Sequence, residues 1–256
     1  MDTKRKEPSG ADGLIEGRNA VTEALRAGVP VDKVWLLKDA DGAPLRRIAA
    51  LARSAGGVVA DADRHKLDAM SVTGAHQGVI ASVAARRYAE VDEILQAASD
   101  RNEPPLLVVC DEISDPHNLG AIIRAAECAG AHGVIIPKRR SAGLTATVAK
   151  ASAGAVSYLP VARVANIPAL LKDLKKRGLW IFGADAAGTV ELYAADWTSP
   201  AALVIGSEGA GMTRLASEQC DFLVKIPMRG NINSLNASAA CAVLLYEALR
   251  QRARTP

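Results

Sequence analysis

Five short, mostly apolar runs between residues 106 and 226 constrain the fold of this chain more than any other feature. They occupy residues 106–110, 134–136, 180–182, 203–205 and 223–226, and longer helical or looped stretches separate them. Strands buried on both faces have this composition, because helices cover each side of a parallel sheet. The runs therefore predict an α/β domain built on an open, mostly parallel sheet.

The composition agrees with such a core. The chain has 256 residues, of which 49% are hydrophobic and 4% are aromatic. Ala, Leu, Val and Ile must therefore fill the interior, which favours tightly packed layers of helix on sheet. A chain of this length can also form two compact domains. The scarcity of aromatic residues argues against binding of single-stranded nucleic acid by broad stacking.

The N-terminal third predicts a second, smaller domain. Residues 1–12 are polar and are predicted to form a disordered tail. Residues 13–85 predict a small layered α/β domain, because helix and strand patterns alternate there. Residues 86–105 are predicted to be a linker with one short helix, at 91–98, and residues 106–256 the sheet domain. In the first domain the expected helices are 19–26, 45–54 and 66–70, and the expected strands are 33–37, 57–60 and 78–83.

Several classes of protein are disfavoured. The four cysteines form no C-x-x-C pair and the four histidines form no H-E-x-x-H pattern, so neither a metal site nor a disulfide framework is indicated. This cysteine usage suits a reducing cytoplasm. We also find no run of eighteen apolar residues and no charged-then-apolar N-terminus, which argues against a membrane span or a secretion signal.

The net charge of +3 is too small by itself to indicate a nucleic-acid partner. Three local basic clusters are nevertheless candidates for contacts with an RNA backbone: Arg46 and Arg47 with Arg53, Lys138-Arg139-Arg140, and Lys172 to Arg177. Each cluster taken alone is more simply interpreted as a solvated surface. The clusters gain weight as RNA contacts only in combination with motifs elsewhere in the chain.

Three polar segments of the sheet domain are the main candidates for a functional site. They read Asn-Leu-Gly-Ala-Ile-Ile-Arg at 118–124, Ile-Gly-Ser-Glu-Gly-Ala-Gly-Met at 205–212 and Ile-Pro-Met-Arg-Gly-Asn-Ile-Asn-Ser-Leu-Asn at 226–236. The first predicts a helix over 118–130 that buries its apolar face and exposes Arg124 on the opposite side. The third leads into a helix over about 234–252. Ordinary Rossmann and P-loop glycine motifs do not occur.

In order and polar content, the three segments resemble the signature motifs of the SpoU (TrmH) family of RNA ribose methyltransferases. The resemblance covers roughly residues 13–252 and is strongest to the RlmB type, which methylates a guanosine of large-subunit ribosomal RNA. It implies a SPOUT-type catalytic domain with a deep C-terminal trefoil knot, preceded by a ribosomal-protein-like domain that binds substrate RNA. It also implies S-adenosylmethionine as the cofactor and a homodimer formed through the knot face.

The resemblance also implies the roles of individual residues. Gly206, Ile226 and Leu235 are expected to line the adenosine pocket of the cofactor. Arg124 is expected to be the catalytic residue. Because a guanidinium stays protonated in proteins, we expect Arg124 to grip the phosphate beside the target ribose and stabilise the developing alkoxide, while the phosphate or water takes the proton.

Four further residues of the motifs complete the expected site. Glu208 is expected to orient Arg124 or a nearby backbone amide. Asn118 either caps its helix or fixes Arg124 from below. Ser234 and Asn236 either cap the last helix or present polar groups to the substrate or to the cofactor carboxylate, and the sequence does not favour one reading.

These expectations lead to one main hypothesis and three alternatives. The main hypothesis is methylation of a ribose 2′-hydroxyl of a guanosine in large-subunit ribosomal RNA. The alternatives are a transfer RNA ribose methyltransferase, a resistance enzyme that methylates a ribosomal adenosine, and a catalytically idle RNA-binding factor for ribosome assembly. The separate N-terminal domain disfavours the transfer RNA enzymes. Retention of all five polar motif residues disfavours the idle factor.

Overall fold

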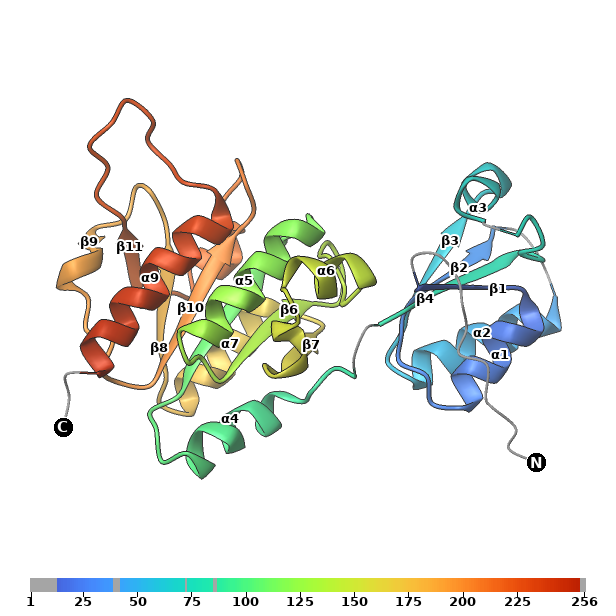
Figure 1. Ribbon diagram of the computed structural model, residues 1–256, viewed down its shortest axis with the longest axis horizontal. Helices are drawn as coiled ribbons and strands as arrows, with labels where there is room; N and C mark the ends of the chain where they lie inside the picture. Colours follow the sequence, from blue (N-terminus) through green and yellow to red (C-terminus); the bar gives the residue numbers. More distant parts are fainter. Residues whose placement is uncertain (1–12, 39–41, 72, 85–86, 254–256) are drawn as a thin grey trace. The chain divides into compact units, whose positions relative to one another are not determined.

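The computed structural model describes residues 13–38, 42–71, 73–84 and 87–253 (Figure 1). The predicted tail at 1–12 lies outside these residues. The chain divides into two compact units, one of residues 1–87 with Gly143–Thr147, and the other of Tyr88–Ala142 with Val148–Pro256. We describe each unit by itself.

The first unit is a four-stranded sheet with the strand order β1-β4-β2-β3. Strands β2 and β3 are parallel, and β4 pairs antiparallel with both β1 and β2. Helices α1 and α2 pack on one face of the sheet, whereas α3 buries Leu67 against Ala62 and Ile80 on the other. The elements are β1 (Leu14–Glu16), α1 (Arg18–Arg26), β2 (Val31–Leu37), α2 (Ala43–Ser54), β3 (Val58–Ala62), α3 (Arg64–Met70) and β4 (Val79–Val83).

The second unit contains a seven-stranded sheet in which every pair of neighbouring strands is parallel. Its order is β7-β6-β5-β10-β8-β11-β9. All five strands expected from the apolar runs are confirmed, and β7 and β9 are additional short strands. The strands are β5 (Leu106–Asp111), β6 (Gly133–Pro137), β7 (Val161–Val164), β8 (Trp180–Ala184), β9 (Val190–Glu191), β10 (Ala201–Gly206) and β11 (Phe222–Lys225).

Helices cover both faces of this sheet, as its apolar strands require. On one face, α4, α7 and α8 pack on side chains of β5, β6, β8 and β10. On the other, α5 and α9 lie side by side (Figure 1). The helices are α4 (Val91–Asp100), α5 (Pro116–Cys128), α6 (Ala146–Ala151), α7 (Ile167–Lys176), α8 (Arg214–Ser217) and α9 (Ala237–Arg252), with 3₁₀ turns at Ala155–Ser157 and Leu192–Ala194. No helix in the described residues is long and apolar enough to cross a membrane.

Helix α4 shows how closely the segment before β5 joins this core. Ile94 is fully buried and lies against Gly133, at the start of β6. A Cβ atom on Gly133 would stand 2.6 Å from the side chain of Ile94. This glycine therefore lets α4 pack directly on the sheet.

Candidate active site

The carboxyl ends of the four central strands lie at one edge of the sheet. Gly206 at the end of β10 pairs in register with Asp111 of β5, and Ala184 of β8 pairs with Val224 of β11. Open α/β sheets bind their ligands at this edge, where the loops that follow the strands diverge. The second and third motifs follow β10 and β11, so the topology brings both of them to this edge.

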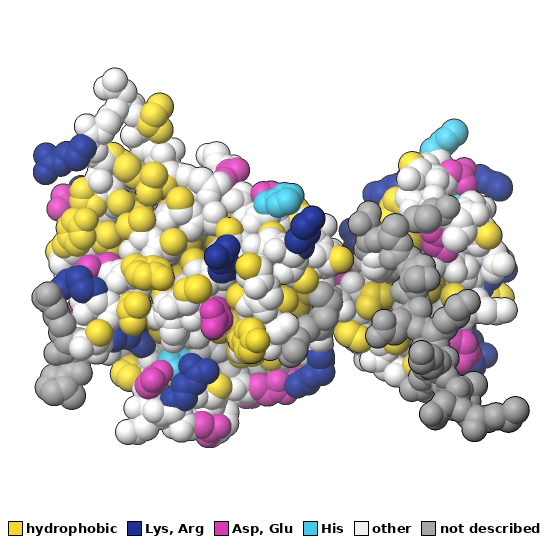
Figure 2. Space-filling view, viewed as in Figure 1, with side chains coloured by type: hydrophobic (Ala, Val, Ile, Leu, Met, Phe, Trp, Pro, Cys, Tyr) yellow, Lys and Arg dark blue, Asp and Glu magenta, His cyan; other side chains and the backbone are white. Residues whose placement is uncertain are grey.

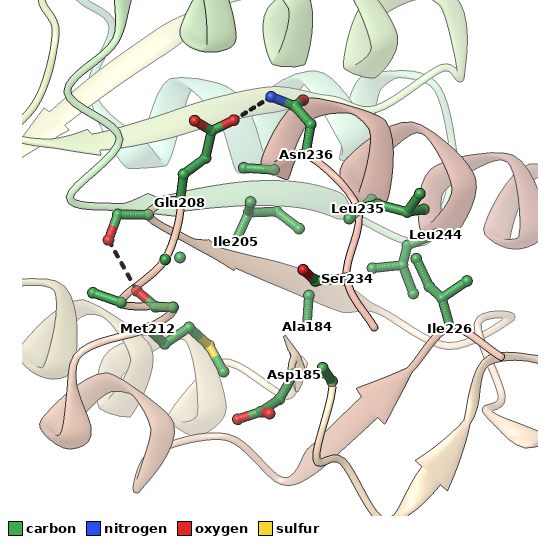
Figure 3. A pocket seen from close by; sticks show the side chains of 18 of the residues that line it. Ala184, Asp185, Ile205, Glu208, Met212, Ile226, Ser234, Leu235, Asn236 and Leu244 are labelled. Atoms are coloured by element: carbon green, nitrogen blue, oxygen red, sulfur yellow. Dashed lines mark hydrogen bonds between the residues drawn. The ribbon is translucent and has the colours of Figure 1, made fainter. Parts of the chain in front are cut away.

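A cavity of about 570 Å³ opens there (Figure 3). Its walls come from the ends of β8, β10 and β11, the loop after β10, the loop before α9, and the first turns of α9. The lining residues that matter below are Asp185, Gly206, Glu208, Ile226, Ser234, Leu235, Asn236, Ala237 and Ala240. The small residues Ala237 and Ala240 in the first turns of α9 form part of the cavity wall.

The loop after β10 folds back tightly over the end of its own strand. Ser207 and Gly211 exchange two backbone hydrogen bonds, each with an N···O distance of 2.9 Å. A Cβ atom on Gly206 would lie 2.1 Å from backbone atoms of Gly211 and Met212. Position 206 therefore requires glycine for close backbone approach, and the turn presents backbone groups to the cavity.

A buried carboxylate binds the backbone just after this turn. Asp111 is 3% exposed, and its Oδ2 accepts a hydrogen bond of 2.6 Å from the backbone N–H of Thr213. Asp111 was not among the site residues expected from the sequence. An Asp directly after an apolar strand run was the available signal, because the carboxyl end of such a strand is the usual place for polar site residues.

One side chain, Asn236, connects the three motifs. Its Oδ1 accepts hydrogen bonds from the backbone N–H groups of Ser238 and Ala239, so it is the N-cap of α9. Its Nδ2 donates to Asn118 Oδ1 at 2.9 Å and also to Glu208 Oε1 (Figure 3). Residues 118, 208 and 236 therefore form one polar network at the mouth of the cavity.

The structure corrects three sequence expectations about local contacts. Asn118 does not cap α5, because Asp115 accepts the backbone hydrogen bonds of His117 and Asn118 while Pro116 occupies the first turn. Glu208 contacts Asn236 instead of Arg124.

The third correction concerns Ser234, which the sequence placed at the start of the last helix. Helix α9 begins at Ala237, so Ser234 lies two residues before its cap, in the loop that lines the cavity.

The predicted site residues fall into two groups. Gly206, Ile226, Leu235, Glu208, Ser234 and Asn236 all line the cavity. Asn118 joins them through its hydrogen bond to Asn236. Arg124 is exposed on α5, as its helical phase predicted, and does not line the cavity. Within the described parts of the chain, its guanidinium has no hydrogen-bond or ion-pair partner.

The charged side chains that line the cavity are both acidic. They are Glu208 and Asp185, and no Lys, Arg or His occurs among the described lining residues. Nearby, burial raises the pKa of Cys220 to about 12, and the negative charges of Asp221, Asp111 and Asp185 act in the same direction. The arrangement therefore favours a ligand with positive charge, an apolar part against Ile226 and Leu235, and contacts to backbone groups.

Comparison with known proteins assigns the chain to a family. Residues 105–246 match the SpoU rRNA Methylase family, and residues 14–89 match the family described as RNA 2′-O ribose methyltransferase substrate binding. The chain belongs to the SpoU methylase family. The relative YacO of Bacillus subtilis (strain 168), whose name places it among TrmH family tRNA/rRNA methyltransferases, is 49% identical over 93% of this chain and 95% of its own length.

Two solved methyltransferase structures agree with this assignment. The SpoU methyltransferase AviRb from Streptomyces viridochromogenes, in complex with AdoMet, is 28% identical with a TM-score of 0.61 and covers 95% of this chain and 92% of its own. An AdoMet-bound rRNA methyltransferase from Sinorhizobium meliloti is 26% identical with a TM-score of 0.58, over 93% and 87% respectively. The family assignment therefore holds along both units and not for the sheet unit alone.

Proposed function

We propose that the protein is an S-adenosylmethionine-dependent RNA methyltransferase that modifies the ribose 2′-hydroxyl of a guanosine in large-subunit ribosomal RNA. The observation that supports this most is the hydrogen-bonded network of Asn118, Glu208 and Asn236 at the mouth of the cavity. It unites one polar residue from each family motif, although these residues are up to 118 positions apart.

The cavity suits S-adenosylmethionine. Gly206 and the turn that follows offer backbone donors and acceptors, and Ile226, Leu235 and Leu244 form an apolar wall. The two acidic lining residues complement a cationic cofactor, since the sulfonium and amino groups are positive. Titration calorimetry with S-adenosylmethionine tests this directly, because an idle assembly factor that has lost the cofactor site would give no binding heat.

The chemistry requires alignment and removal of one proton. The bound cofactor supplies an electrophilic methyl group, and the ribose oxygen displaces the sulfur in line, so the C–O bond forms as the C–S bond breaks. Correct positioning accounts for much of the rate, up to roughly 7–11 kcal/mol for well-oriented reactants. In our proposal, Arg124 grips the phosphate beside the target ribose, and its positive charge stabilises the developing alkoxide. The hydroxyl proton passes to that phosphate or to water.

Ribosomal RNA is favoured as the substrate because the chain has a separate RNA-recognition unit. Residues 14–89 match a substrate-binding family of RNA 2′-O ribose methyltransferases, and the Sinorhizobium meliloti rRNA enzyme aligns over 93% of the chain. The name of the Bacillus subtilis relative covers both transfer and ribosomal RNA, which makes transfer RNA the second candidate.

A homodimer is the assembly that the surface of α9 supports. Val243, Tyr246 and Leu249 are 38%, 52% and 36% exposed and follow one another at helical spacing. Hydrophobic side chains gather on the face that α9 presents (Figure 2). The long loop between β11 and α9 adds the exposed Ile232 and Leu235. We propose that this face, including the knotted segment implied by the family, joins two copies of the chain in the cytoplasm. Light scattering should give twice the 26.7 kDa mass of one chain, and Tyr246→Glu should shift it toward the monomer.

The decisive experiment maps ribose methylation in the ribosomal and transfer RNAs of a strain that lacks this gene. One guanosine of large-subunit RNA should lose its methyl group, and the wild-type protein should restore it. Arg124→Ala and Arg124→Lys should both fail, because lysine keeps the charge but loses the planar fork that holds a phosphate. A missing methyl group in transfer RNA would reject the ribosomal substrate, and near-full turnover by Arg124→Lys would reject the role of Arg124.

A further inference from the structure

The basic segment Lys138-Arg139-Arg140 has no role in the site described above. It follows β6 directly, so it lies at the same carboxyl edge of the sheet as the cavity. All three side chains are exposed. Within the described residues, the side chains of Lys138 and Arg139 have no hydrogen-bond or ion-pair partner, so their charges are available to a ligand.

The other basic cluster of this unit, on α7, is different. Lys175 pairs with Asp221 at 2.7 Å, and Arg177 pairs with Asp92 and Asp173 at 2.5 and 2.8 Å. These internal ion pairs neutralise much of the charge of that cluster. Its last turn also precedes β8 directly and thus lies at the opposite, amino edge of the sheet.

The segment after β6 is anchored to the connection that leads into the first motif. Arg140 Nη1 donates to Glu112 Oε1 at 3.1 Å, and the Ala142 N–H donates to the Ile113 carbonyl at 2.9 Å. The Ser141 hydroxyl also donates to the Ile113 carbonyl, at 3.2 Å. Because residues 112–115 continue into α5 and Asn118, these bonds hold the basic segment in a defined position relative to the motif network.

Both residues of the anchoring ion pair have strained backbones. Arg140 has a φ of 56° and Glu112 a φ of 61°, in the left-handed region that side chains other than glycine rarely adopt. Such conformations persist where the surrounding structure enforces them, and they concentrate at functional sites. Here the two strained residues are joined to each other, and the neighbouring Lys138 and Arg139 are exposed.

From these observations we propose that Lys138 and Arg139 bind phosphates of the substrate RNA close to the nucleotide that enters the cavity, with Arg140 as their anchor. Strand β6 lies two strands from β10, which separates the two strand ends by roughly 10 Å. Long basic side chains span much of that distance. The proposal rests on the assignment of RNA as substrate, and it adds a phosphate contact on the catalytic unit to recognition by the first unit.

The test compares two double variants that each remove two positive charges. Lys138→Ala with Arg139→Ala removes the proposed contacts, and Lys172→Ala with Lys176→Ala removes two exposed charges from α7. Filter binding to deproteinised ribosomal RNA and to bulk transfer RNA, across a series of KCl concentrations, measures the affinity and its salt dependence. Calorimetry with S-adenosylmethionine should show unchanged cofactor affinity in both variants.

Removal of two phosphate contacts should weaken RNA binding about tenfold and reduce the slope of log affinity against log salt by about 1.4 to 1.8. The α7 variant should keep a slope close to that of the wild type, and the charge-preserving swap Lys138→Arg with Arg139→Lys should keep it too. Equal losses in both double variants, or no loss in the first, would overturn the proposal. The comparison is made on whichever RNA the wild type binds more tightly. A preference for transfer RNA would reject the ribosomal substrate, but the two double variants would still test the role of the basic segment.

Discussion

At the scale of single residues, the site depends on positions where an added Cβ atom would displace the backbone. Gly206 is the strongest case. The turn from Ser207 to Gly211 returns so closely over it that no side chain fits without movement of backbone atoms. By contrast, a Cβ atom on Gly230, in the loop before α9, would meet nothing within 4 Å. Two glycines of neighbouring motifs thus have very different structural roles.

We expect Gly206→Ala to displace the turn over β10 and abolish binding of S-adenosylmethionine. The free energy of unfolding should also fall, by about 1–3 kcal/mol, as in other overpacked sites. Calorimetry and urea denaturation measure the two effects. Gly230→Ala is the matched control and should change neither. Cofactor binding by Gly206→Ala at wild-type affinity would show that the turn does not form the cofactor site.

At the scale of elements, the start of α9 combines two functions in one residue. Asn236 satisfies the first N–H groups of the helix through its Oδ1 and ties the helix to the other motifs through its Nδ2. Asn166 caps α7 in the same way, through a hydrogen bond of 2.9 Å from Ala169 N–H, and it lines no part of the cavity. A comparison of the two caps can therefore distinguish an effect on helix stability from an effect on the geometry of the site.

Asn236→Ala and Asn166→Ala should each lower the free energy of unfolding by about 1 kcal/mol, the usual cost of losing a cap. Methyl transfer should fall about tenfold or more in Asn236→Ala, because Asn118 and Glu208 lose their common partner. Asn166→Ala should retain turnover. Denaturation curves and single-turnover assays give both quantities, and similar turnover in the two variants would contradict a positioning role for Asn236.

At the scale of the whole molecule, the cavity of the second unit lies at one edge of its sheet, and a set of stabilising polar contacts lies at the opposite edge. The amino edge is closed by polar contacts among residues far apart in sequence. Arg252 donates to the carbonyls of Pro104, Pro105, Trp197 and Ser199, at distances between 2.5 and 3.1 Å. His132 Nδ1 accepts from the Leu106 N–H at 3.0 Å, and its Nε2 contacts Glu103 at 3.0 Å. These contacts lie at the edge opposite to the cavity.

His132 should make stability depend on pH. Burial lowers its pKa below the ordinary value of 6.5, and Arg101 and Arg252 add to this, against the opposing effect of Glu103. At pH values well above 6.5 the imidazole is neutral in both the folded and the unfolded chain, so it adds no pH dependence. As the pH falls through 6.5 the unfolded chain binds a proton before the folded chain does, so the free energy of unfolding falls with the pH.

Urea denaturation between about pH 5 and 6.5 should therefore show a smaller decline in His132→Gln than in the wild type. Glutamine has no titrating group, and its amide oxygen offers an acceptor for the Leu106 N–H. An identical decline in the two proteins would assign the pH dependence to other groups.

Local sequence patterns were sufficient wherever a structure depends on neighbouring residues. The five apolar runs predicted five strands, and the helical phase of residues 118–130 predicted the exposure of Arg124, because burial follows the period of the element. Asp115 directly before Pro116 is a typical N-cap pattern, and it predicts the start of α5 although it was not used for the expected helix at 118–130. The roles of the motif residues came from family resemblance and stay predictions until the variants are measured.

What the sequence determined by itself was the class of the fold and the segments in which the polar residues stand. The tertiary structure decided which of them meet: Asn118, Glu208 and Asn236 form one network, Asp111 supports the turn over Gly206, and the basic segment after β6 lies at the same edge of the sheet as the cavity. Strand order places the ends of β5, β6, β8, β10 and β11 at one edge. That order depends on packing between segments far apart in the chain, which no local pattern encodes.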